Sequence, residues 1–176
     1  MSDVFPVSHQ GAGTVRVQFV TTLAVPAEPE LTELSAVSSF DATPYFQAEA
    51  LQIAHEQAKV NDTRLSDESV RESLGLSSFT IDALRYVHNP QAAAAAAGNK
   101  AFDKFTPGLT AYFVFRFGTK ALKSAAAFDE DQRVVVYQVQ FGDQHQPLPT
   151  GDNAVHVIEQ PVTLTLIENN YTLVAP

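Results

Sequence analysis

Residues 109–118 read LTAYFVFRFG, and this stretch decides the class of fold. It is rich in aromatic and β-branched residues, which pack well on a pleated surface and are enriched in strands. A Thr-Pro-Gly turn at residues 106–108 precedes it, and Gly118 closes it. Turn residues on both sides of a short apolar run are typical of a β-strand. The sequence therefore predicts a strand over residues 111–117.

Six more runs along the chain have the composition or the alternation of strands. In residues 15–23, Val15, Val17 and Phe19 alternate with polar residues and so share one face. The other five runs are residues 48–59, 77–88, 133–141, 154–160 and 162–168, the last two separated by Pro161. About seven strands predict a mainly β protein, built as a β-sandwich or an open β-barrel.

Residues 48–59 (AEALQIAHEQAK) carry conflicting signals. Their alanine, glutamate, glutamine and lysine content favours a helix. Leu51, Ile53 and His55 nevertheless lie at every second position, as in a strand. The residues by themselves leave helix and strand both open.

The sequence predicts one flanking helix. Asn89 followed by Pro90 has the form of a helix start, with a capping side chain and then a proline in the first turn. Residues 92–97 are six alanines, and alanine is the strongest helix former. We expect the helix to continue through residues 101–105, to pack on the sheet through its phenylalanines, and to stop at Pro107.

Length and composition indicate a single domain over residues 14–176, because 176 residues bury roughly 70% of the unfolded surface. Residues 1–13 are polar and contain glycine, so we expect a flexible arm that orders only against another surface. A short helical turn is expected over residues 30–36. The chain has no apolar run of about 20 residues that crosses a membrane as a helix, and its first residues lack the features of a signal peptide.

Charge is unevenly distributed along the chain. The net charge is −9, with seven acids and one base in residues 1–58 and four acids and no base in residues 134–176. Proteins that grip duplex DNA depend on lysine and arginine to release counterions from the phosphates. This composition excludes a protein that binds the phosphate backbone of DNA, and it favours a protein whose surface repels DNA.

Known catalytic patterns fail on their spacing. The chain has no cysteine, which removes disulfides, thiolate metal sites and cysteine nucleophiles. His55 and Glu56 begin a zinc-protease pattern, but Lys59 occupies the place of the second histidine. Residues 75–79 begin like a nucleophile elbow and end in Phe79 where glycine is needed. We therefore expect no enzyme activity, no metal and no cofactor.

Three signatures recur in order along the chain: NDTRL at residues 61–65, YVHNPQ at residues 86–91 and TPGLTAYFVFRFG at residues 106–118. In that order and at about that spacing they resemble the major tail tube proteins of long-tailed, siphovirus-type bacteriophages. The resemblance covers roughly residues 14–160 and implies a strand over residues 48–59. The chain departs from the family pattern in its alanine-rich segment and its short carboxyl end.

The resemblance implies a structural virion protein. Tail tube proteins of this type are small sandwiches with a flanking helix, and six copies form a ring. Rings stack into a hollow tube that carries DNA to the host without catalysis or a cofactor. The implied partners are further copies of the chain, the tape measure protein and the tail terminator. The implied location is the phage tail, and the host cytoplasm during assembly, with no membrane and no specific DNA binding.

Four charged residues are candidates for the tube's function. We expect Glu49 and Glu56 to contribute to a negative lumen along which DNA slides, since like charges repel within a Debye length of about 8–10 Å. Asp62 and Arg64 flank Thr63 in the NDTRL turn. They either hold that turn locally or contact a neighbouring subunit.

Two arginines lie within apolar strand patterns, where the guanidinium must reach solvent or a carboxylate. These are Arg85 and Arg116. An acid of a neighbouring subunit is one candidate partner, and Asp82 or Asp103 of the same chain is another. We take both arginines as candidates for inter-subunit contacts.

The strands at residues 111–117 and 134–141 have apolar or uncharged side chains on both faces. A lone sandwich usually keeps one face of each sheet wet and has edges that discourage pairing. We therefore expect the sheets of neighbouring subunits to join edge to edge in a closed ring. Two alternatives stay open. One is a tail terminator, neck or injection-system tube subunit of the same fold. The other is a monomeric β-barrel that binds a small apolar ligand among Phe113, Phe115 and Tyr137.

Overall fold

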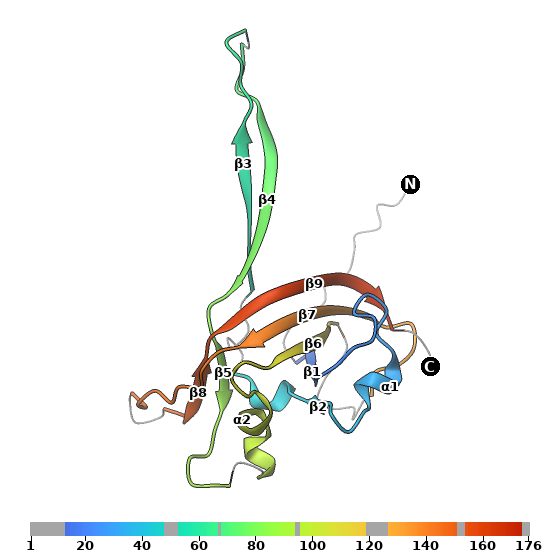
Figure 1. Ribbon diagram of the computed structural model, residues 1–176, viewed down its shortest axis with the longest axis vertical. Coiled ribbons are helices and arrows are strands. Elements are labelled where there is room, and N and C mark those ends of the chain that lie inside the picture. Colours follow the sequence, from blue (N-terminus) through green and yellow to red (C-terminus); the bar gives the residue numbers. More distant parts are fainter. Residues whose placement is uncertain are drawn as a thin grey trace, which may run out of the picture.

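The computed structural model describes residues 13–47, 53–66, 68–93, 96–118, 127–150 and 154–173. Its centre is a sheet of five antiparallel strands (Figure 1) in the order β2-β1-β6-β7-β9. Their bounds are β1 Arg16–Val20, β2 Phe40–Asp41, β6 Thr110–Arg116, β7 Arg133–Phe141 and β9 Val162–Thr172. The architecture confirms the prediction of a mainly β fold.

The remaining strands form two smaller antiparallel sheets of two strands each. β5 (Leu84–Val87) pairs with β8 (Val157–Gln160), and β3 (Ile53–Asn61) pairs with β4 (Glu72–Ile81). Figure 1 shows β3 and β4 as a long hairpin that stands clear of the rest of the molecule. We call the remainder, with the central sheet and the β5–β8 pair, the body.

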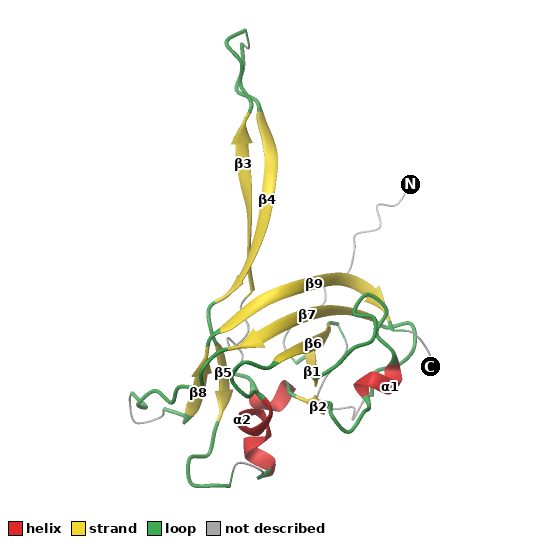
Figure 2. Cartoon of the chain, in the orientation of Figure 1, coloured by secondary structure: helices red, strands yellow, loops and turns green. Residues whose placement is uncertain are grey.

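The helices are short and lie on the body (Figure 2). They are α1 (Leu31–Leu34) and α2 (Lys100–Lys104), with 3₁₀ turns η1 (Thr43–Tyr45) and η2 (Ala97–Asn99). The short turn expected over residues 30–36 is confirmed as α1, and its first turn is closed by a capping box between Glu30 and Glu33.

An aromatic cluster fills one face of the central sheet. Phe19, Phe105, Phe113 and Phe141 are each at most 2% exposed. The rings of Phe105 and Phe141 stack with centroids 5.0 Å apart, and those of Phe105 and Phe19 lie 5.1 Å apart. Offset and edge-to-face pairs of this kind add to the gain from apolar burial. This cluster is the first core of the body.

A second core covers the opposite face of the same sheet. Val20, Val114 and Val136 project to it from the strands. Leu34 of α1 and Leu173, beyond β9, close over them. The second face is therefore covered within one chain, by α1 and by residues near the carboxyl end. The expected edge-to-edge joining of neighbouring sheets stays a prediction.

The predicted helix is much shorter than expected. Residues 90 and 91 form a turn, residues 92 and 93 are not helical, and regular α-helix begins only at Lys100. Asn99 explains the difference, since its buried side chain accepts the N–H of Asn89 at 2.8 Å and donates to the carbonyls of Asn89 and Ala92 at 3.0 and 3.3 Å. These bonds offer the backbone an alternative to the helix. Residues 94 and 95 lie outside the described residues.

Strand boundaries also differ from the predictions. Residues 53–59 adopt the strand alternative, as part of β3, and residues 48–52 lie outside the described part. The single strand expected over residues 77–88 is two, β4 and β5. With β2 added, the described residues hold nine strands where about seven were expected. Apart from Gly13, the expected arm over residues 1–13 also lies outside the described residues, so the arm and the domain bounds stay predictions.

Candidate functional site

The β3–β4 hairpin is the most exposed part of the described chain. Of the nine residues of β3 and the ten of β4, Ile81 alone is buried. Ile53 and Ile81 anchor the base of the hairpin in the first core. An isolated two-stranded ribbon is marginally stable in water, because it has no apolar face to bury. The hairpin therefore resembles an element that is stabilised by packing against another protein surface.

Local contacts hold the two strands in register. The ring of His55 stacks on Phe79 across the strands at 4.4 Å. Farther out, Lys59 and Glu72 form an exposed ion pair at 3.1 Å, which contributes under about 1 kcal/mol. These contacts shape the hairpin without burying it.

The NDTRL turn closes the outer end of the hairpin. The side chain of Asn61 accepts the Thr63 N–H at 2.9 Å, and the Thr63 hydroxyl accepts the Arg71 N–H at 3.0 Å. The Asp62 N–H donates to the Arg71 carbonyl at 3.0 Å. Asp62 and Arg64 are both exposed at this end. An inter-subunit contact through these two side chains stays a prediction.

Exposed apolar side chains gather on the hairpin. Ten large hydrophobic residues are exposed among the residues that the structure describes, and five of them belong to the hairpin and its turn. These five are Val60, Leu65, Val70, Leu74 and Leu76. Concentrated exposure of this kind marks an interaction surface more often than scattered single residues do. Leu74 and Leu76 were not predicted from the sequence as part of this surface, because they precede the strand expected to begin at residue 77.

An open apolar pocket of about 420 Å³ lies at the base of the hairpin. We call it the base pocket. Its lining comes from β1, η1, β3, β6, β7 and nearby residues, and consists of Val15, Val17, Thr43, Phe46, Gln47, Ile53, Phe115, Phe117 and Tyr137. The ligand-binding alternative requires a cavity lined by Phe113, Phe115 and Tyr137, and two of these, Phe115 and Tyr137, line this pocket. Phe113 is fully buried in the first core instead.

Arg85 has a partner within its own chain. It lies opposite Glu159 in the β5–β8 pair, and its guanidinium meets that carboxylate at 2.6 Å. The acid it meets is therefore Glu159, and neither Asp82 nor Asp103. The arginine side chain is 57% exposed, so the pair lies at the surface. A contact of Arg85 with another subunit stays a prediction.

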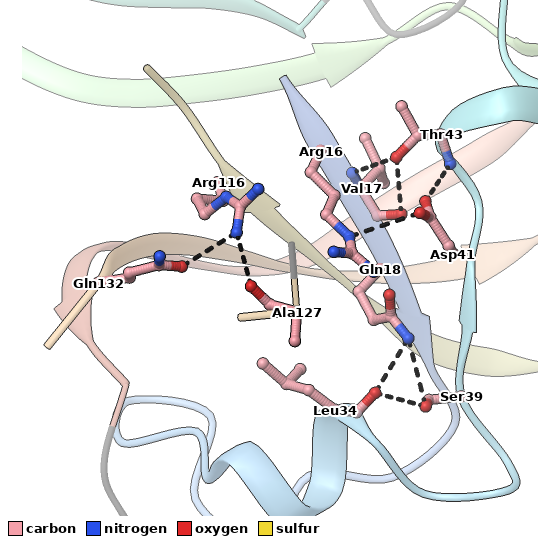
Figure 3. Close-up of polar contacts among 10 residues, drawn as sticks. All are labelled: Arg16, Val17, Gln18, Leu34, Ser39, Asp41, Thr43, Arg116, Ala127 and Gln132. Atoms are coloured by element: carbon pink, nitrogen blue, oxygen red, sulfur yellow. Dashed lines mark hydrogen bonds and ion pairs between the residues drawn. The ribbon is translucent and has the colours of Figure 1, made fainter. Parts of the chain in front are cut away.

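Arg116 lies inside the body and is 1% exposed. Its guanidinium donates to the Ala127 carbonyl and to the Gln132 side chain, both at 3.1 Å (Figure 3), and lies over the ring of Phe128. Burial lowers the pKa of Arg116 below its ordinary value, and the nearby Arg16 lowers it further. The structure gives Arg116 a role in holding residues 127–132 to β6, and its inter-subunit contact stays a prediction.

Polar contacts next to Arg116 position the start of β1 (Figure 3). Arg16 meets Asp41 of β2 at 3.4 Å. Gln18 donates to the Leu34 carbonyl at 2.9 Å and so ties α1 to the sheet. Gln18 is itself buried, at 6% exposure, although it is one of the polar residues that alternate with Val17 and Phe19.

Of the two candidate lumen residues, Glu49 and Glu56, the structure describes only Glu56. Glu56 is exposed on β3, paired across the hairpin with Ser78. Glu49 lies outside the described residues. Their assignment to a lumen stays a prediction.

Within the described ranges, no group of three or more histidine, aspartate and glutamate side chains is arranged to hold a metal ion. The helices of those ranges are all too short to span a bilayer. What the described residues offer is an apolar projection and an apolar pocket, which suit association between proteins.

The comparison with protein families agrees with this geometry. A family model described as "Phage tail tube protein" matches residues 3–176. The chain therefore belongs to the phage tail tube protein family, whose members are structural components of the virion tail. A search of curated protein sequences returns no match.

Proposed function

We propose that this chain is the repeating subunit of the tail tube of a long-tailed phage. Six copies close into a ring, and rings stack into a hollow tube through which DNA passes to the host. The observation that carries the proposal is the exposed apolar β3–β4 hairpin. At about 3.3 Å per residue, the ten residues of β4 extend roughly 33 Å, which is comparable to the diameter of a small domain. A projection of that length reaches a neighbouring copy.

The edges of the central sheet supply a second route to association. β2 and β9 are its two edge strands, and β9 is eleven residues long. A long edge presents backbone groups that pair readily with another chain. Copies joined through different surfaces of each molecule form rings when the rotation closes and filaments when it does not. A tube needs both kinds of contact. One kind closes copies into a ring, and the other stacks rings along the tube axis.

The charge of the chain suits a conduit for DNA. The net charge is −9, and Glu56 is exposed on the hairpin. We propose that Glu49 and Glu56 face the lumen, where negative charge keeps DNA from adhering. Replacing both with lysine is expected to slow genome ejection and to make its rate depend on salt. Normal ejection kinetics in such particles would refute this assignment.

The proposed partners other than the chain itself are the tape measure protein and the tail terminator. A tail terminator, a neck protein or an injection-system tube subunit is the rival within the same fold. A ligand-binding monomer is the rival outside it, and the base pocket, with Phe115 and Tyr137 in its lining, is the feature that favours it. The size and length of the assembly separate these functions.

Negative-stain electron microscopy of the purified protein at rising concentration tests the proposal. The expected result is six-fold rings that lengthen into tubes. Single rings at every concentration point to a terminator. A protein that stays monomeric throughout, with a small molecule retained in native mass measurement, contradicts the proposal.

A further inference from the structure

We propose that the base pocket of one subunit receives Leu74 and Leu76 from the β3–β4 hairpin of a second copy. This inference rests on the proposed self-assembly and names the contact through which it proceeds. It goes beyond that function because it assigns a donor segment and an acceptor site on the chain.

The donor segment is apolar, exposed and uncharged. Leu74 is 72% exposed and Leu76 is 88% exposed. Residues 73–80 read SLGLSSFT and contain no charged side chain. Burying these residues of β4 therefore removes apolar surface from water. The charge opposite Leu74, on Lys59, is already paired with Glu72 at 3.1 Å.

The acceptor matches the donor in chemistry. None of the nine residues that line the base pocket carries a charged side chain, and most of them are apolar. Phe117 stands at the pocket with 54% of its surface exposed, stacked on Phe115 with ring centroids 6.0 Å apart. An aromatic side chain held in this way at the surface is a ready contact for an incoming leucine.

The donor cannot fill the pocket of its own chain. Ile53 lines the base pocket and is also the first residue of β3. From that point the hairpin leads away from the body (Figure 1). Leu74 lies opposite Lys59, and the strand from Ile53 to Lys59 spans roughly 20 Å. The leucines are therefore carried away from the pocket at the base of their own hairpin and toward that of another molecule.

A donor and an acceptor at different places on one molecule make a heterologous contact. Each copy then has one free hairpin and one free pocket, so the contact repeats from copy to copy until it closes or extends. The observed placement of hairpin and pocket thus supports the open-ended association that a tube requires.

Cysteine cross-linking tests this contact, because the natural chain has no cysteine. One sample carries Leu76→Cys and a second carries Phe117→Cys. The two are mixed under assembly conditions and treated with a mild oxidant or a short bismaleimide. The expected result is a cross-linked dimer of the two chains, in at least tenfold greater yield than with a matched control pair. The control pairs Phe117→Cys with Leu148→Cys, another leucine that is 89% exposed.

The outcomes separate this inference from the proposed function. Tubes that form while the two pairs cross-link equally overturn the pocket contact and leave the tube function standing. Preferential cross-linking of Phe117→Cys to Phe5→Cys assigns the pocket to the amino-terminal segment and also overturns the contact. A protein that never assembles and retains a small apolar molecule overturns both proposals.

Discussion

The body and the hairpin both contain large apolar residues, but they differ in how far those residues are buried. In the body, phenylalanines on one face of the sheet and valines on the other are buried within a single chain. In the hairpin, leucines and valines of comparable size stay in water. Exposure of this kind is costly for a monomer. The contrast teaches that the two cores of the body are closed within one chain, whereas the apolar side chains of the hairpin find no cover there. We propose that a second copy supplies that cover.

Breaking the first core is expected to have the largest effect. Phe105 is fully buried and meets the rings of Phe19, Phe113 and Phe141 at 5.0–5.5 Å. Phe105→Ala removes these contacts and leaves a cavity, so the free energy of unfolding should fall by about 3–5 kcal/mol. Urea denaturation measures the loss. Phe117→Ala, at a half-exposed position, is the matched control, and an equal loss there would refute the assigned core.

Breaking the polar link between the β5–β8 pair and the rest of the body is expected to cause the second-largest loss of stability. Gln160 is fully buried, donates to the carbonyls of Phe105 and Gly142 at 2.8 Å, and accepts the Tyr86 hydroxyl at 2.9 Å. Gln160→Ala leaves these groups without this partner, at a cost of about 1–3 kcal/mol. Thermal unfolding measures it. A variant as stable as the wild type would show that the link is dispensable. Gln140→Ala, at an exposed glutamine of β7, serves as the control.

The hairpin should respond in the opposite way to the body. Replacing Leu74 and Leu76 with serine removes exposed apolar surface, so the free energy of unfolding of the free subunit should change by no more than about 0.5 kcal/mol. Assembly should weaken at least tenfold, which corresponds to about 1.4 kcal/mol. Light scattering across a concentration series measures association, with Leu148→Ser as the control. Assembly at the wild-type concentration would exclude the leucines from the contact.

The smallest effect is expected from the ion pair on the hairpin. The side chains of Lys59 and Glu72 are 68% and 51% exposed. Solvent and salt screen such a pair, so Lys59→Ala should change the free energy of unfolding by less than about 0.5 kcal/mol. A chemical denaturation curve checks this, with the reciprocal variant Glu72→Ala as its control. A loss above 1 kcal/mol would mean that the hairpin stabilises the free subunit more than its exposure indicates.

Short-range patterns predicted most of the body from the sequence. β6, β7 and β9 were found because aromatic and β-branched runs between turn residues specify strands whatever covers them. The predicted helix was too long because the Asn99 side chain forms hydrogen bonds with backbone groups of residues 89–93. The sequence position of Asn99 does not indicate these bonds. The amide side chain overrides the alanine run by giving the backbone other partners.

The candidate site was harder to predict than the fold. Alternation in residues 53–59 is consistent with a strand, but it does not tell whether that strand joins the main sheet or leaves it. Likewise, Leu74 and Leu76 look like core residues by type, and their exposure is what makes them candidates for a contact with another chain. Arg116 shows the reverse case, since a charged residue expected at an interface lies inside the body beside Gln132.

The most direct test of the account removes the hairpin and keeps the body. Ile53 and Ile81 are paired at its base, so residues 54–80 can be replaced by a two-residue Asn-Gly turn. Electron microscopy of this variant at the highest attainable concentration then decides whether the hairpin drives assembly. We predict a folded monomer with an unfolding midpoint near that of the wild type and no rings or tubes. Tubes of normal appearance would contradict it.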